Sequence, residues 1–259
     1  MGHEREGRLP RSKHWRAVVG SLPTAAFDSS VTGQVAGDTL ANVRTRLDRI
    51  ELDPGVAAAF EYLLALAAKG KATDKTIRVS NTPELESNPA ALRIAASAVE
   101  WVDQHMGSPE YGAIAKQAVA DTIAKWTTAK DDQTNLFGEK PTASERWEAA
   151  STGAGFSEVS RLFFARFTER YLNYFLEREA SATIGNIDAR NAFAHNLHAH
   201  VNEVSKHAFE TSKITQSFAA GWYNRHATED FPSSAKVRGF MRLAFQKIRE
   251  ELRREGLDE

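Results

Sequence analysis

The sequence contains no cysteine. This absence excludes disulfides, thiolate catalysis and cysteine-ligated zinc, and it suits a reducing compartment. The chain also lacks any apolar stretch near the roughly 20 residues that span a bilayer, and its charged N-terminus lacks the apolar run of a signal peptide. The net charge is −1, so no global field draws the whole chain onto nucleic acid or a membrane. We therefore expect a cytoplasmic protein with no membrane partner.

Proline is scarce, with eight among 259 residues. We expect these prolines to stand beside helices and never inside one, because an interior proline removes a backbone hydrogen bond and clashes with the preceding turn. Three of them follow a capping side chain and would occupy the first helical position, in the pairs Asp53-Pro54, Asn88-Pro89 and Ser108-Pro109. Strand-like alternation is nearly absent, and only residues 76–79 have an extended pattern. The sequence predicts an all-α, multi-helix bundle.

Composition divides the chain into four parts. We expect a basic, irregular N-terminal arm over 1–34, an alanine-rich helical half over 35–130, a linker over 131–156 and a long-helix half over 157–259. Small alanine side chains let helices pack closely, and the aromatic residues of the last part suit a core. The predicted helices cover residues 35–52, 55–69, 89–106, 110–129, 142–150, 157–182, 187–222 and 233–255.

The N-terminal arm mixes basic side chains with an aromatic one. Its basic and aromatic residues are Arg5, Arg8, Arg11, Lys13, His14, Trp15 and Arg16. Arms of this kind grip nucleic acid or dock onto protein. The apolar residues Trp15, Val18, Val19 and Leu22 favour docking, either on the chain's own bundle or on a partner.

The segment 187–222 has two distinct faces at helical spacing. A core stripe contains Ala194, Leu197, Val201, Val204 and Ala208. A second face contains Asn191, His195, His198 and Asn202. Exposed faces usually carry lysine, glutamate and arginine, so this second face favours a partly buried polar seam or a site. Arg190 projects into the apolar sector, where a guanidinium needs a partner.

The run Arg190-Asn191-Ala192-Phe193-Ala194-His195 resembles the Arg-polar-x-x-x-His signature of the HEPN superfamily. That family consists of compact helical proteins and includes many metal-independent ribonucleases. The resemblance implies a bundle that dimerises and brings two copies of the motif around a scissile phosphate. It assigns Arg190 to the phosphate and its developing charge, His195 to proton transfer, and Asn191 to the polar position after the arginine. A structural polar seam is the alternative interpretation of the same residues.

The last predicted helix carries a row of basic residues beside an apolar stripe. The row consists of Arg238, Arg242, Arg249 and Arg253. Such a row contacts nucleic-acid phosphates in some proteins, and in others it covers the core with its alkyl stems. Both interpretations stay open.

Two weaker patterns could suggest a metal site or a phosphate-binding loop, and we interpret neither of them as such a site. His200, Glu203 and His207 share a helix face, which we interpret as solvated. The glycines of 151–156 have no preceding strand and no following Gly-Lys-Ser/Thr, so we interpret them as part of the linker and not as a phosphate-binding loop. The sequence predicts no cofactor and no metal.

Two functional hypotheses follow. The first is a non-catalytic helical subunit that binds other macromolecules, with a protein partner or a second copy expected and nucleic acid possible. The HEPN-like motif places it among bacterial multi-protein systems, anti-phage defence included. The second is a HEPN-like, metal-independent endoribonuclease that uses Arg190 and His195. An enzyme requires these two side chains to converge in an accessible cleft, from one or two subunits, whereas a binding subunit predicts them separated or buried.

Overall fold

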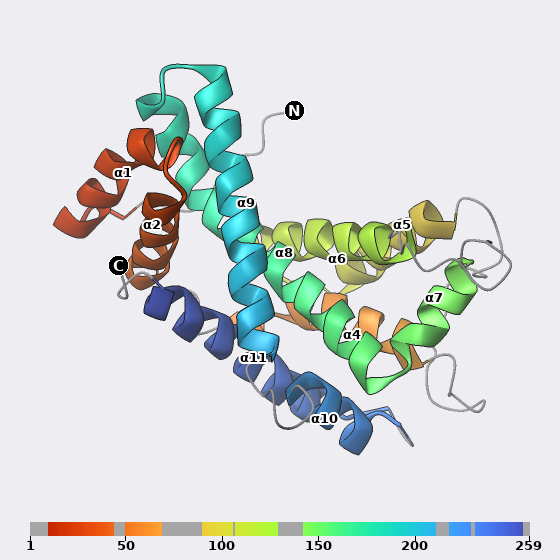
Figure 1. Ribbon diagram of the computed structural model, residues 1–259. Coiled ribbons are helices and arrows are strands. Elements are labelled where there is room, and N and C mark those ends of the chain that lie inside the picture. The colour runs from red at the N-terminus through yellow and green to blue at the C-terminus, as the bar shows by residue number, and fades with distance from the viewer. Residues whose placement is uncertain are drawn as a thin grey trace, which may run out of the picture. The chain divides into compact units, whose positions relative to one another are not determined.

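A computed structural model describes residues 10–43, 50–68, 90–105, 107–128, 142–210, 218–228 and 231–255. Within these ranges every regular element is a helix, so the predicted all-α, multi-helix bundle is confirmed (Figure 1). No helix in this part of the chain is long and apolar enough to cross a membrane. Residues 76–79, with their extended pattern, lie outside the described ranges.

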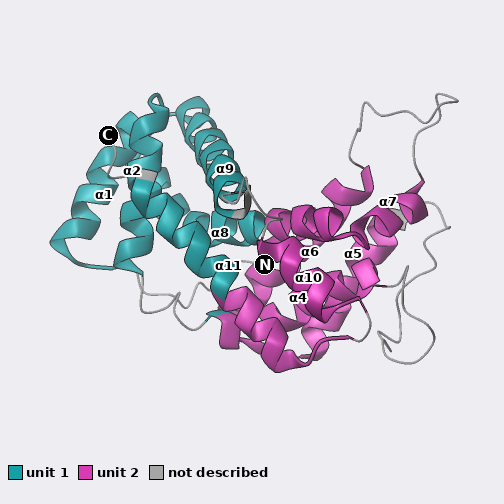
Figure 2. Cartoon of the chain, turned by 60° about the horizontal axis from the view of Figure 1, so that its bottom comes forward, with its two compact units in different colours: residues 1–50, 164–208, 243–259 teal, residues 51–163, 209–242 magenta. Residues whose placement is uncertain are grey.

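The chain folds into two compact units, shown in teal and magenta in Figure 2. Unit 1 contains residues 1–50, 164–208 and 243–259, and unit 2 contains residues 51–163 and 209–242. Helices α8 (Gly153–Thr183) and α11 (Ser234–Glu255) contribute residues to both units. The units are therefore assembled from segments far apart in sequence, unlike the four consecutive parts that composition predicts.

Helices α1 (Lys13–Ala25) and α2 (Ser29–Asn42) open unit 1. The predicted irregular arm is wrong from Lys13 onward, because the apolar residues Trp15, Val18 and Leu22 recur at helical spacing and are all buried. Trp15 also donates from Nε1 to Glu179 Oε1 of α8 at 3.4 Å. The described part of the arm thus packs within the chain's own unit 1.

Prolines mark most helix ends as expected, with one exception. Asp53 caps α4 (Pro54–Ala68) by accepting the backbone N–H of Gly55, and Ser108 caps α6 (Pro109–Thr128) by accepting that of Tyr111. The Asn88-Pro89 pair lies outside the described residues. Pro23 lies inside α1, which corrects the expectation that no proline enters a helix. It sits in the last turn, where α1 ends two residues later.

The rest of unit 1 is built on α8 and α9 (Ile187–Glu210), together with the second half of α11. Its aromatic core includes Phe164 and Phe167, whose rings pack edge-on against Phe245 with centroids 4.9 and 5.3 Å apart. Helix α2 approaches its neighbours at glycines. A Cβ at Gly33 would lie 2.8 Å from the His200 ring, and one at Gly37 would lie 3.1 Å from the Leu252 carbonyl oxygen.

Unit 2 is organised around α4, which is apolar around its circumference and almost entirely buried. It packs against α5 (Ala90–Gln104), α6 and α7 (Ala143–Ala150), and the short helix η1 (Ile50–Leu52) precedes it. Phe60 of α4 stacks on Phe240 of α11 with ring centroids 5.3 Å apart. Phe156 of α8 stacks on Tyr223 of α10 (Phe218–His226) at 4.5 Å. These rings form the centre of the unit.

Where the structure describes the predicted linker over 131–156, it contains the short helix that the sequence predicts over 142–150. Helix α7 begins at a capping box in which Thr142 and Glu145 satisfy each other's backbone N–H. Helix α8 follows α7 after two residues, and a Cβ at Gly155 would overlap the Ala149 carbonyl oxygen. The glycines therefore permit a tight helix-to-helix corner. Residues 131–141 lie outside the described ranges, as do residues 211–217 within the long helix predicted over 187–222.

Candidate functional site on helices α8 and α9

The HEPN-like motif lies in the first two turns of α9. Asn186 fixes the start of this helix, because its Oδ1 accepts the backbone N–H of Ala189 at 2.8 Å. Asp188 in the first turn adds a negative charge that suits the helix N-terminus. From Ile187 to Glu210 the helix is uninterrupted. Ideal helical geometry therefore gives the directions of the motif side chains.

The two residues assigned to chemistry point in different directions. Arg190 is half-buried, whereas Asn191 and His195 are exposed. The histidine follows the arginine by five positions of regular helix, which turns their side chains about 140° apart. Among the described residues, none forms a hydrogen bond or ion pair with any of these three side chains. The chain by itself does not bring Arg190 and His195 together.

The predicted polar seam on α9 is only partly buried. His198 and Asn202 are half-buried, but Asn191 and His195 face solvent. In the predicted core stripe, Leu197, Val201, Val204 and Ala208 are buried, while Ala194 is exposed at the edge of the stripe. Within the seam, His198 contacts two charged side chains of α8.

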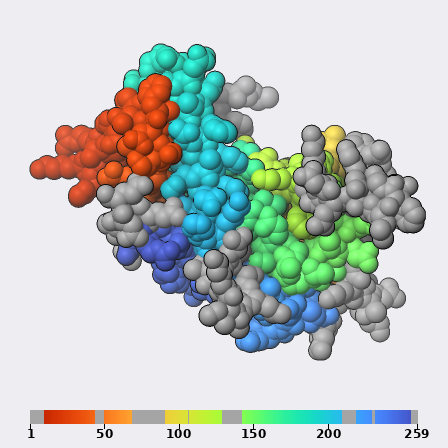
Figure 3. All heavy atoms as spheres, viewed as in Figure 1, coloured from red at the N-terminus to blue at the C-terminus, as the bar shows by residue number. Residues whose placement is uncertain are grey.

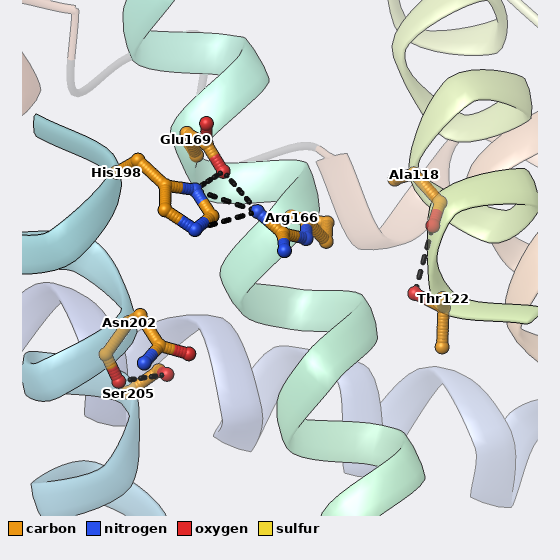
Figure 4. Close-up of polar contacts among 7 residues, drawn as sticks. All are labelled: Ala118, Thr122, Arg166, Glu169, His198, Asn202 and Ser205. Carbon is orange, nitrogen blue, oxygen red and sulfur yellow. Dashed lines mark hydrogen bonds and ion pairs between the residues drawn. The ribbon is translucent and has the colours of Figure 1, made fainter. Parts of the chain in front are cut away.

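His198 belongs to a cluster with two residues of α8, Arg166 and Glu169 (Figure 4). We call these three residues the α8–α9 cluster. Glu169 Oε2 lies 3.0 Å from Arg166 Nη1 and 2.8 Å from His198 Nδ1. Arg166 Nη1 lies 2.6 Å from His198 Nδ1 and 3.1 Å from Nε2. The side chains are 18%, 17% and 33% exposed for Arg166, Glu169 and His198, so they are largely withdrawn from water.

The protonation of His198 decides which hydrogen bonds the α8–α9 cluster forms. With a proton on Nδ1, the imidazole donates to Glu169, and without one, Nδ1 accepts from Arg166. In both cases Glu169 still accepts from Arg166. The Glu169 carboxylate thus compensates the positive charge of the Arg166 guanidinium. The cluster therefore links α8 to α9 and is a poor binding site for an added anion.

Sequence reasoning found His198 but missed Arg166 and Glu169. A signal was present, because both charged residues stand within the aromatic segment that contains Phe163, Phe164 and Phe167. Charged side chains in such a segment need a polar partner when the segment is buried. Their i, i+3 spacing also allows them to pair with each other.

The weaker histidine pattern on α9 splits between two surroundings. Glu203 lies 3.4 Å from His207 and 3.7 Å from Lys206, and Glu203 and His207 are exposed. His200 instead packs its ring against Gly33 of α2. Across the described ranges, no three histidine, aspartate or glutamate side chains are grouped to hold a metal ion.

The predicted basic row lies entirely on α11, with Arg242 and Arg253 exposed and Arg238 and Arg249 half-buried. Arg242 donates from Nε to Glu51 Oε1 at 3.1 Å, and Arg249 is also engaged in an interaction. The neighbouring Arg254 pairs with Glu251. Part of the positive charge of the row is therefore already compensated. Its contact with nucleic acid stays a prediction.

Two titratable groups of unit 2 respond to their surroundings. Burial raises the pKa of the Tyr223 phenol to about 12, and its hydroxyl donates to the Ala67 carbonyl at 3.2 Å. Burial lowers the pKa of His226, and the positive charges of Lys236 and Arg225 lower it further. Neither Tyr223 nor His226 belongs to the motif or to the α8–α9 cluster.

Comparison with protein-family models, with curated proteins and with solved structures finds no significant match to this chain. The functional argument therefore rests on the residues and their geometry.

Proposed function

We propose that this protein is a non-catalytic helical subunit that binds other macromolecules in a bacterial multi-protein system of the anti-phage defence kind. The divergence of Arg190 and His195 on α9 carries this proposal. Phosphodiester cleavage needs a cation and a proton-transfer group at one phosphate. Two side chains that leave a regular helix about 140° apart do not reach one phosphate from a single chain. The choice of system rests on the HEPN-like motif.

The α8–α9 cluster supports the same proposal. Arg166, Glu169 and His198 are the residue types that acid–base chemistry on a phosphate employs, and they do converge. Their polar atoms, however, are directed at one another at 2.6–3.1 Å. Mutual satisfaction of this kind suits a structural contact between two helices.

A HEPN-like, metal-independent endoribonuclease is the second candidate. The exposure of Asn191 and His195 favours it, because no hydrogen bond to another described residue occupies either side chain. A second copy of the chain could then supply an arginine to the exposed histidine. This candidate requires a homodimer, whereas the first accepts either a homo-oligomer or a different protein partner.

Cleavage of a mixed RNA pool by the purified full-length protein, without metal ions, separates the two candidates. The variants are Arg190→Ala and His195→Ala, and the matched control is His207→Ala, an exposed histidine of the same helix outside the motif. Circular dichroism verifies that each variant folds. We expect all four proteins to leave the RNA equally intact, because the motif performs no chemistry.

Cleavage that is lost in both motif variants and retained in His207→Ala would overturn the proposal in favour of the ribonuclease. Cleavage that persists equally in all four proteins would come from a contaminant or another site, and it would exclude Arg190 and His195 from the reaction.

A further inference from the structure

Four basic residues lie on the solvent side of helix α1 and of the two residues before it. Arg11, Lys13, His14 and Arg16 are all exposed, and we call them the α1 basic face. No described residue forms an ion pair or a hydrogen bond with any of these four side chains. The first turn of α1 contains no acidic residue. The α1 basic face thus concentrates positive charge within six residues of a chain whose net charge is −1.

This charge differs from that of the basic row on α11. There Arg242 is paired with Glu51, and Arg249 is engaged as well. On α1 the Glu179 carboxylate accepts from the indole of Trp15 and not from a basic side chain. Ser12, which lies within the face, caps the helix and donates to Asn42. Among the described residues, none compensates the charge of Arg11, Lys13 or Arg16.

Helix α1 is anchored in unit 1 on the side opposite to its basic residues. Trp15, Val18 and Leu22 are at most 3% exposed and hold the opposite side of the helix in unit 1. Between the basic residues and the C-terminal end, the outer side carries Ala17 and Gly20, both exposed. A Cβ added at Gly20 would touch nothing, so the surface beside Arg16 is open. The atoms of α1 and α2, in red, reach the surface on the face shown in Figure 3.

We infer that the α1 basic face binds the phosphate backbone of a nucleic acid, without reading its sequence. Lysine and arginine side chains one helical turn apart, such as Lys13 and Arg16, can neutralise successive phosphates and release their counterions. A lipid surface fits less well, because the apolar side of α1 is buried in unit 1 and cannot insert among acyl chains. The inference rests on the proposed function, since it names the class of macromolecule that the subunit binds.

The test is the binding of a short, mixed-sequence single-stranded RNA to the full-length protein, measured by fluorescence anisotropy over a range of salt concentrations with a chelator present. The neutralised variant is Arg11→Gln/Lys13→Gln/Arg16→Gln. Its matched control is Arg178→Gln/Arg225→Gln/Lys236→Gln, which lowers the net charge equally at exposed positions elsewhere. A third variant, Arg11→Lys/Arg16→Lys, keeps the charge and changes the side chains.

We expect the wild-type protein, the matched control and the charge-preserving variant to bind RNA similarly at low salt. The neutralised variant should bind at least about tenfold more weakly, and the slope of log K against log salt concentration should flatten by about 2, at roughly 0.7 per lost contact with a single strand. Circular dichroism establishes that the variants fold.

Three results would overturn the inference. The first is equal binding by the neutralised variant and its matched control, and the second is no RNA binding by the wild-type protein at low salt. The third is binding to vesicles that contain phosphatidylserine without binding to RNA. Gel electrophoresis of the same samples shows whether the RNA is cut. Shortened RNA that depends on His195 would contradict the proposed non-catalytic function, whereas loss of binding alone would contradict only this inference.

Discussion

Arg190 and His195 leave the same helix about 140° apart, the arginine on the side of the buried Leu197 and the histidine towards solvent. This relationship separates the two residues that the HEPN-like motif would join at a phosphate. It follows from the regularity of α9, which runs without interruption from Ile187 to Glu210. The motif is therefore present in the sequence without forming a catalytic pair within one chain.

The α8–α9 cluster should act as one coupled unit in stability. Glu169→Gln leaves Arg166 without a countercharge, and His198→Phe removes the imidazole that contacts both Arg166 and Glu169. We expect each change to lower the free energy of unfolding by about 1–3 kcal/mol. A double-mutant cycle measured by urea denaturation should give a coupling energy of at least about 0.5 kcal/mol. Strict additivity of the two effects would contradict the cluster.

Asp53 should be the most sensitive cap of unit 2. Its Oδ1 accepts from Gly55 and Val56 at the start of α4, and its Oδ2 accepts from Ser108 N before α6 at 2.8 Å. Because the residue is buried, Asp53→Ala should cost about 2–3 kcal/mol of unfolding free energy. The matched control is Asp28→Ala, an exposed cap that accepts from Ser30 and Val31 at the start of α2 alone. A loss at Asp28 equal to that at Asp53 would show that the second helix contributes nothing.

Two glycine-to-alanine changes should have opposite signs. Gly20 lies in the middle of α1, and an added methyl group there meets open space, so Gly20→Ala should raise the unfolding free energy by about 0.5–1 kcal/mol. At Gly155 the methyl group would overlap the Ala149 carbonyl oxygen, so Gly155→Ala should lower it by about 1–3 kcal/mol. Thermal denaturation of both variants checks this, and stabilisation by Gly155→Ala would refute the tight α7–α8 corner.

Stability should fall at alkaline pH because of Tyr223. Burial raises its pKa to about 12 in the folded protein, above the ordinary value of 10. The stabilising effect is complete below pH 10 and is lost as the pH rises towards 12, since the unfolded chain releases the proton first. The loss should reach about 2 kcal/mol, and Tyr223→Phe should remove most of it. The measurement is urea denaturation between pH 10 and 12. An equal loss of unfolding free energy in Tyr223→Phe would show that another group causes it.

The helices were predictable where apolar spacing and caps agree. Asp53-Pro54 and Ser108-Pro109 mark the starts of α4 and α6, and the apolar residues of each helix determine its buried face. The arm was misjudged because its basic residues obscured the helical spacing of Trp15, Val18 and Leu22. The corner at Gly155 resembled a linker in composition, but the close approach of Gly155 to the Ala149 carbonyl oxygen, six residues earlier, determines its geometry.

The candidate site was less predictable than the fold. The sequence places Asn191, His195, His198 and Asn202 on one helix face, but it does not say which of them meets a second helix. Arg166 and Glu169 lie about 30 residues away in sequence, so only the packing of α8 on α9 identifies His198 as their partner. Local periodicity gives the direction of a side chain, whereas its partner depends on tertiary contacts.

The central claim is that the protein binds a macromolecule and does not cut it. The most direct test recovers RNA from its complex with the wild-type protein, in the presence of a chelator, and compares its length with that of the input. The account predicts that RNA is bound and recovered at full length, with binding weakened by Arg11→Gln/Lys13→Gln/Arg16→Gln. Shortened RNA from the wild-type protein, with full-length RNA from His195→Ala, would contradict it.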